Sequence, residues 1–237
     1  MSRSVVSLAL VAGVVLPSAQ AYAHGFAGPH MFVSTLIIDD PNVADEASLP
    51  TFSWQPRPSN GGPISNGFAA EFEFDKRITE NFGFGISSGY QWLTQPGNKT
   101  ANGWENLAVT LKYKPIVSAE HEFMMSVGVV RNFARSGANG TNGATIGNDD
   151  SSSTAPTIYF GKGFGDLPIG WARAFAITGE LSYQIADKKL KITGTDPDSG
   201  GLLVNNGTWN QWSGGLSLQY SMRYLQSQVK DLGLPCG

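Results

Sequence analysis

The sequence contains very little cysteine, few charges and no long apolar run beyond its first residues. Its one cysteine, Cys236, precedes the last of 237 residues and can form no internal disulfide. Charged residues make up 15% of the chain, and the formal net charge of −3 provides no basic surface for nucleic acid. After the start, no window approaches the roughly 18 unbroken apolar residues of a spanning helix. A disulfide-stapled domain, a nucleic-acid-binding protein and a helical membrane protein are therefore disfavoured.

Residues 1–23 have the pattern of a secretory signal peptide. Arg3 precedes an apolar run from Val5 to Leu16, and small residues follow at two sites that fit cleavage. Cleavage after Ala21 or after Ala23 fits the pattern, and we favour Ala23. The leader predicts that the mature protein lies in a cell envelope.

The segment Asn81–Thr94 alternates between large apolar and small polar residues. Strand side chains alternate across a sheet, so one face is aromatic and the other consists mainly of Gly, Ser and Gln. Repeated strand after strand, this pattern is typical of a transmembrane β-barrel with its apolar face toward lipid. A secreted β-sandwich or a lipocalin-like soluble barrel is the alternative, but a solvated face usually carries more Lys, Glu and Thr.

We predict an all-β fold: an antiparallel, up-and-down transmembrane β-barrel of about eight strands with long outer loops. Residues 24–46 form an irregular periplasmic segment that packs into or under the barrel, residues 47–225 form the barrel, and residues 226–237 form a periplasmic tail. The predicted strands are Leu49–Arg57, Asn66–Lys76, Asn81–Thr94, Trp104–Lys114, Glu122–Phe133, Pro156–Gly165, Trp171–Ile185 and Trp209–Tyr224.

Short and long connections alternate along the chain, as they do in outer-membrane barrels. Placing the short turns in the periplasm puts both chain ends there, which requires an even number of strands. Aromatic residues near the strand ends are predicted to form the interfacial girdles. They are Trp92, Trp104, Trp171, Trp209, Trp212, Tyr220 and Tyr224.

Four segments resemble uncharacterised outer-membrane β-barrel proteins of Gram-negative bacteria, described as transporter-like or porin-like. These are HGFAGPHMF, DDPNVADEASLP, FEFDKRITENFG and YSMRYLQSQVKDLGLP. The resemblance implies residence in the outer membrane, insertion by the barrel-assembly machinery and contact with outer-membrane lipid. Such barrels usually end on a strand that finishes in Phe or Trp, and this chain does not. We therefore expect an unusual last strand, or a longer barrel of which this chain is a part.

Charged residues on the inner face of the predicted barrel are the main candidates for function. They are Glu71, Glu73, Asp75, Lys112, Glu122, Glu180 and Arg223. Neighbouring carboxylates repel each other unless Lys or Arg compensates them. An eight-strand barrel has room only for side chains, which favours a structural salt-bridge cluster. A wider barrel would make the same residues a cation-preferring constriction.

Histidine is scarce, and it suggests two further hypotheses. Cleavage after Ala23 would leave His24 as the N-terminus, where its amine and imidazole, with His30, could bind copper. Outer-membrane lipid-modifying enzymes need a serine beside a histidine. His121 falls in a predicted periplasmic turn without such a partner. We therefore expect no cofactor and no catalysis, and predict a structural role or passive transport of small solutes.

Overall fold

The computed structural model describes residues 25–35, 38–57, 65–94, 100–137, 146, 151–195, 201–205 and 207–229. The predicted leader, residues 1–23, lies outside these residues, as does His24. Within them the protein is all-β with one short α-helix, and the main strands form one antiparallel sheet. The predicted fold class is thus confirmed at the level of an all-β antiparallel architecture.

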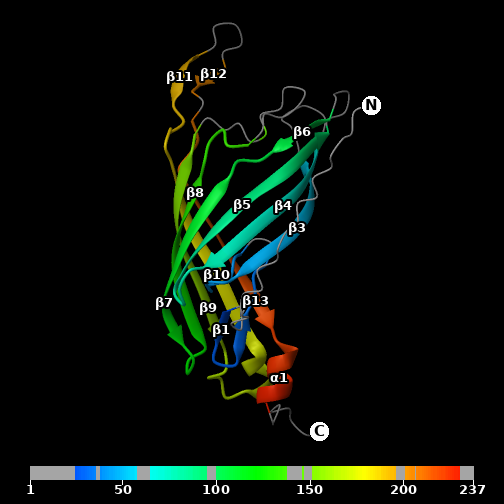
Figure 1. The fold of residues 1–237 in the computed structure, drawn as a ribbon, viewed down its shortest axis with the longest axis vertical. Coiled ribbons are helices and arrows are strands. Elements are labelled where there is room, and N and C mark those ends of the chain that lie inside the picture. Colours follow the sequence, from blue (N-terminus) through cyan, green and yellow to red (C-terminus); the bar gives the residue numbers. More distant parts are fainter. Residues whose placement is uncertain are drawn as a thin grey trace, which may run out of the picture.

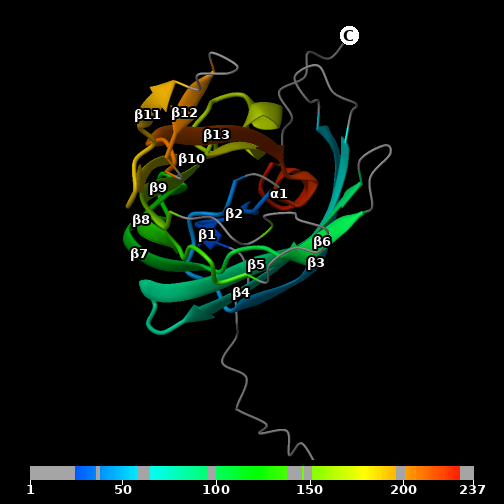
Figure 2. The ribbon, with the colours of Figure 1, turned by 90° about the horizontal axis from the view of Figure 1, so that it is seen from above.

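The sheet follows the chain almost strand by strand, in the order β13-β10-β9-β8-β7-β5-β4-β3, with β6 paired to β5. It curls into a half-barrel (Figures 1 and 2). Its strands are β3 (Glu46–Arg57), β4 (Ser65–Arg77), β5 (Phe82–Thr94), β6 (Ala101–Trp104), β7 (Ala108–Ser118), β8 (Phe123–Asn132), β9 (Ser153–Gly163), β10 (Phe175–Ala186) and β13 (Gln211–Tyr220). Smaller elements are β1 (Gly25–Ala27), β2 (His30–Phe32), β11 (Ile192–Thr195), β12 (Leu202–Val204), the 3₁₀ helix η2 (Gly170–Ala174) and α1 (Met222–Gln228).

Three predicted strand boundaries are wrong. The predicted strand Trp104–Lys114 is split between β6 and β7, and β7 runs through Pro115 because its register shifts between Tyr113 and Ile116. A register shift accommodates a residue that cannot donate a ladder hydrogen bond. Trp171 lies in η2 and not in a strand.

The predicted last strand is also too long at both ends. Trp209 precedes β13, and the strand ends at Tyr220. Ser221 then caps α1, because its side-chain oxygen accepts a hydrogen bond from the backbone N–H of Tyr224 at 3.1 Å. Tyr224 and Arg223 therefore lie on a helix, although alternation alone suggested a strand.

Apolar side chains cover the convex face of the sheet. In β9, Ile158 is 47% exposed, whereas its neighbours Thr157 and Tyr159 on the concave side are each 2% exposed. In β5, Ile86 is exposed while Gly85 is buried. This arrangement is the reverse of a soluble sandwich, where the large apolar side chains are buried.

The concave face holds the plug segment, which we define as residues 25–35 and 38–45. It begins with the β1–β2 hairpin, which lies within the curl of the sheet (Figure 2). Gly28 in its turn has a φ of +61°, and a Cβ there would lie 2.5 Å from the Ala119 carbonyl oxygen. Only glycine suits both constraints. The predicted irregular segment is therefore partly a hairpin, and it packs inside the sheet.

Glycines on the concave face make room for the plug segment. A Cβ at Gly161 would lie 2.8 Å from ring carbons of Phe32, which is fully buried. A Cβ at Gly83 would lie 2.6 Å from Val43. Phe32, Ala27, Met124 and Ala176 form the buried apolar cluster between the plug and the sheet.

We predict that Gly161→Ala destabilises the protein by about 1–3 kcal/mol, because the added methyl group overpacks the buried Phe32 ring. The free energy of unfolding from a denaturant titration measures the effect. Gly194→Ala in β11 is the matched control, since its Cβ would meet only Leu203 at 3.7 Å. Equal stability of the two variants would show that the plug does not pack where the structure places it.

Candidate functional site

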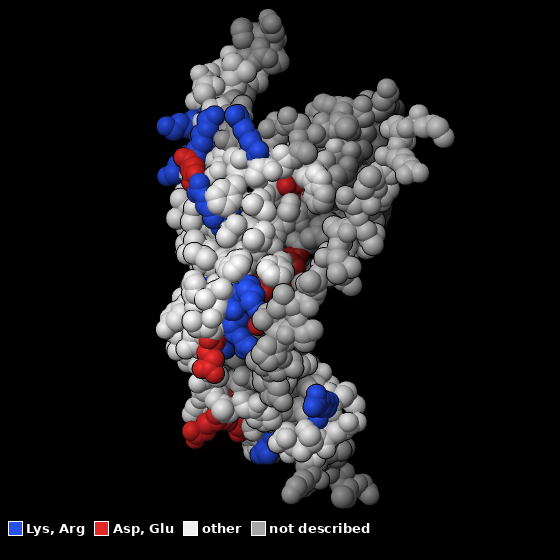
Figure 3. Space-filling view, in the orientation of Figure 1, with Lys and Arg blue, Asp and Glu red and all other residues white. Residues whose placement is uncertain are grey.

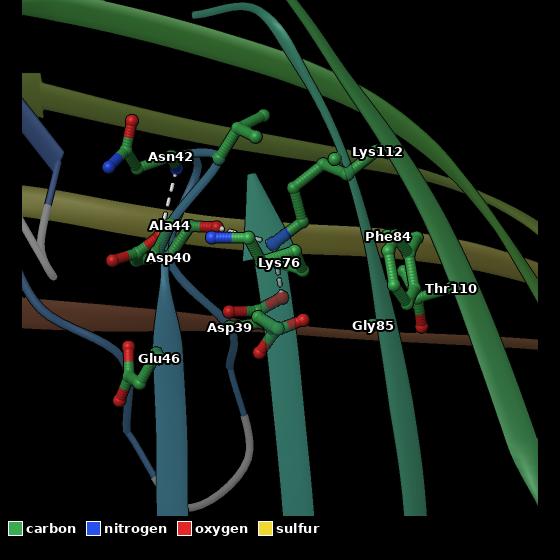
Figure 4. Close-up of a pocket in the computed structure, with 13 residues that line it drawn as sticks. Asp39, Asp40, Asn42, Ala44, Glu46, Lys76, Phe84, Gly85, Thr110 and Lys112 are labelled. Atoms are coloured by element: carbon green, nitrogen blue, oxygen red, sulfur yellow. Dashed lines mark hydrogen bonds and ion pairs between the residues drawn. The ribbon is translucent and has the colours of Figure 1, made fainter. Parts of the chain in front are cut away.

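Lys112 lies at the centre of the contacts between the plug segment and the sheet. It projects from β7 into the concave side, and its residue is only 8% exposed. Its Nζ pairs with the Asp39 carboxyl group and donates to the Asp40 carbonyl oxygen at 3.2 Å. Figure 4 shows this ammonium group directed at the plug segment. The Tyr159 ring, with its centroid 4.5 Å from Nζ, covers the cation from another side.

Further hydrogen bonds join the plug segment to strands on both sides of Lys112. Lys114 Nζ donates to Asn42 Oδ1 at 2.8 Å, and the Ser126 hydroxyl donates to the Pro41 carbonyl. From β13, Gln219 Nε2 donates to the Val33 carbonyl at 2.8 Å. The plug is thus fixed to β7, β8 and β13 by polar contacts in a mostly buried setting.

The surroundings of Lys112 are strongly acidic. Burial raises the pKa of Asp40 to about 6, Lys112 opposes that shift, and the neighbouring Asp39 adds to it. Asp75 lies over Gly85 on the wall of the small pocket drawn in Figure 4, where Glu46 also points inward. One buried cation therefore compensates several carboxyl groups.

A larger cavity of about 690 Å³ continues from this cluster toward the end of the sheet with the long connections. Five carboxyl groups line it: Asp39, Glu71, Glu73, Glu105 and Glu180. Among the described residues that line it there is neither Lys nor Arg. The rest of its wall is largely Ser, Thr and Asn, so the cavity is polar and acidic.

A second buried polar cluster lies at the other end of the sheet, where the turns are short. Glu122 accepts a hydrogen bond from the Tyr224 hydroxyl at 2.7 Å and from the Gly165 backbone N–H at 2.8 Å. His30 Nδ1 lies 2.9 Å from the same carboxyl group, and the His30 and Tyr224 rings are 4.3 Å apart. The cluster joins the β1–β2 hairpin to the β7–β8 turn and to α1. Figure 1 shows β1 and α1 together at this end.

The geometry of this cluster requires an unusual backbone. Glu122 has a φ of +46°, and Cβ atoms at Gly163 or Gly165 would each lie 2.4 Å from its carboxyl oxygens. Burial, followed by the hydrogen bond to Glu122, raises the pKa of Tyr224 well above its usual value, so its hydroxyl remains a donor. The cluster is therefore a structural clasp between the two ends of the described chain.

The structure separates the predicted inner-face residues into three places. Asp75 and Lys112 line the pocket against the plug, and Glu71, Glu73 and Glu180 line the larger cavity. Glu122 belongs to the clasp. Arg223 is exposed on α1, so its predicted position on the inner face is wrong. Sequence reasoning missed Asp39 and Asp40 as partners of Lys112, because they precede the sheet and read as turn residues.

The predicted girdle aromatics occupy several settings. Trp104, Trp171, Trp209, Trp212 and Tyr220 are 42–69% exposed, and Trp92 packs against Tyr90 at 4.6 Å. Tyr224 is buried at 6% exposure in the clasp, so its predicted place in a girdle is wrong. Its hydroxyl has a partner in Glu122, which explains why a helix turns it inward.

The histidines bear on the metal and enzyme hypotheses. His30 is 1% exposed and faces Glu122, and His121 Nδ1 lies 3.8 Å from Asp166 in an exposed turn. In the described part of the chain, no three His, Cys, Asp or Glu residues are grouped to hold a metal ion. Copper binding through His24 and His30, and lipid-modifying activity, stay predictions. No helix in that part is long and apolar enough to cross a membrane.

Comparison of the chain with known protein families, curated proteins and solved structures finds no significant match.

We predict that Lys112→Met destabilises the protein by about 3–5 kcal/mol, because it leaves buried carboxyl groups without their cation. The pKa of Asp40 is raised above its unfolded value, so its contribution to stability falls as pH rises through the interval up to about 6. Removing Lys112 raises that pKa further and extends the fall to higher pH. Free energies of unfolding at pH 5 and pH 8 should therefore differ more in the variant than in the wild type.

Lys189→Met is the control for this experiment, because Lys189 is exposed near β11 and its side chain contacts none of these carboxyl groups. A loss in Lys112→Met no larger than in this control, or one independent of pH, would contradict the assigned role of Lys112.

Tyr224→Phe should cost about 1–3 kcal/mol, because a buried carboxyl group loses a hydrogen-bond donor. Hydrogen exchange should speed up in the β1–β2 hairpin, which shares that group. Tyr220→Phe is the matched control, as Tyr220 is 42% exposed on the sheet. Unchanged exchange in Tyr224→Phe would show that the clasp does not fix the hairpin.

Proposed function

We propose that the protein is a non-catalytic β-barrel of the Gram-negative outer membrane, with β3 to β13 crossing the bilayer. In this role it is a structural barrel or supports passive passage of small solutes. Its acidic interior favours cations over anions. The single observation that carries the proposal is the large apolar area on the convex face, opposite a polar concave face filled by the plug segment.

The convex face is too apolar for a soluble monomer. Side chains that are 40–68% exposed recur on strand after strand, including Leu111, Val129, Ile158, Leu181 and Leu216. A typical soluble monomer exposes apolar patches of only a few hundred Å². Figure 3 shows one face on which uncharged residues cover most of the described surface. Hydrocarbon is the environment in which such a face is stable.

The position of one outward cation also supports this assignment. Arg131 lies next to the last residue of β8, at the end with the long connections. Its guanidinium donates to Asp187 at 2.8 Å and to Thr154 at 2.7 Å. The hydrogen bond from Arg131 lowers the pKa of Asp187, so the pair stays charged at neutral pH. A charged pair fits the membrane interface and not the hydrocarbon core.

Passive transport is supported by the acidic cavity, whose 690 Å³ would admit small hydrated solutes. The plug segment lies between this cavity and the short-turn end, so a solute that crosses has to pass it. The Lys112–Asp39 pair would then control passage through its hold on the plug. A fully plugged barrel with a structural role is the limiting case of the same geometry.

Membrane insertion is tested by flotation of the folded protein with phospholipid vesicles, comparing the wild type with Leu111→Arg. Leu111 is 48% exposed on the convex face of β7. We expect the wild type to float and the variant to insert poorly, because Arg near the bilayer midplane costs about 2–4 kcal/mol.

Leu203→Arg is the matched control. Leu203 is also 48% exposed, but it lies in β12, outside the main sheet. It should float like the wild type. A wild-type protein that stays in the aqueous fraction as a monomer without detergent would overturn the proposed membrane location.

A further inference from the structure

The curled sheet ends in two unpaired edges, β3 and β13. Within the described residues, β3 pairs only with β4 and β13 only with β10. The outward apolar side chains at these edges are unusually exposed: Trp54 by 63%, Leu216 by 68% and Leu218 by 66%. In the interior strands, Val129 is exposed by 42%. Each edge therefore lacks the neighbour that covers side chains elsewhere in the sheet.

Closing β3 directly onto β13 conflicts with the contents of the sheet. An eight-strand barrel has an interior just wide enough for side chains or one small ligand. This sheet encloses a hairpin and a further stretch of backbone, with Phe32 fully buried and Ile38 5% exposed. A ring of only these eight strands would have to expel the plug segment and break its contacts with Lys112. The sheet is thus an arc of a wider barrel.

Unpaired edges also conflict with a bilayer. Each backbone N–H or C=O without a partner costs several kcal/mol in hydrocarbon, so open sheet edges do not face lipid. Pro50 and Pro56 remove two donors from β3, but its other residues retain theirs. Additional strands must therefore cover both edges if the protein spans a membrane.

The two edges match each other in direction. Successive strands on the path from β3 to β13 are antiparallel, and the path has seven pairings. β3 and β13 therefore run in opposite directions. A second copy with the same orientation in the bilayer places its β3 antiparallel to β13 of the first. A two-fold rotation about the bilayer normal makes the two seams equivalent.

We propose that two copies of this chain pair edge to edge, β3 with β13 at each seam, and form one continuous barrel around two plug segments. Eight strands of the path from each copy make sixteen, a number at which barrels enclose an aqueous interior. The two acidic cavities then face a shared lumen. This proposal rests on the membrane location proposed above.

Cysteine cross-linking in vesicles tests the pairing, in a Cys236→Ser background so that no native thiol remains. One chain carries Ser53→Cys in β3, and a differently tagged chain carries Ser213→Cys or Ser217→Cys in β13. The chains are co-expressed, recovered from the floated vesicles and treated with a short bis-maleimide, which tolerates a small register difference. We expect a dimer-sized product that contains both tags. Either variant expressed alone should give none, because each seam joins unlike edges.

Ser182→Cys on the interior strand β10 is the control partner for Ser53→Cys and should remain unlinked. A double variant with Ser53→Cys and Ser217→Cys in one chain reports self-closure. Floated protein that links within one chain, or that yields no linked dimer, overturns the edge pairing while leaving the membrane location intact. Protein that fails to float indicates failure of the membrane location itself.

Discussion

A buried lysine on the concave face of the sheet determines where the N-terminal segment lies. Lys112 cannot remain charged in that setting without anionic partners, and Asp39 with the Asp40 carbonyl supplies them. Because the plug segment carries these groups, it is drawn into the curl of the sheet. The glycines, the acidic cavity and the clasp are all arranged around that placement.

The small residues of the inner face have a different reason from the one that the sequence suggests. Gly, Ala and Ser opposite a row of aromatics indicate a narrow lumen when the strands are considered alone. In the structure these positions are the surface against which a second layer of backbone packs, as Gly83 does with Val43 and Gly161 with Phe32. The same observation implies a barrel wider than eight strands, since the interior holds main chain as well as side chains.

Much of the sheet could be predicted from alternation. The segments near β4, β5 and β8 were found because their side chains keep a strict period of two, and their antiparallel order follows from short connections. Alternation failed at Trp171 and Tyr224, where an apolar pattern continues into helical turns. Local hydrogen bonds decide those positions: Ser221 caps α1, and Glu122 holds the Tyr224 hydroxyl.

The candidate site was only half predictable. Lys112 and the carboxyl groups of β4 were identified because inward charges stand out on a small-residue face. Asp39, Asp40 and the partners of Glu122 could not be, because these contacts join residues 72 to 102 positions apart and have no local signal. The left-handed backbone at Glu122 is likewise invisible in sequence.

The central claim is that the bulky face of the sheet contacts lipid, and tryptophan fluorescence tests it directly. All six tryptophans lie in the described chain, and Trp54, Trp104 and Trp212 project from the sheet with 46–69% exposure. In vesicles of phospholipid brominated along its acyl chains, the account predicts strong quenching relative to unbrominated vesicles. Equal fluorescence in the two kinds of vesicle would contradict it.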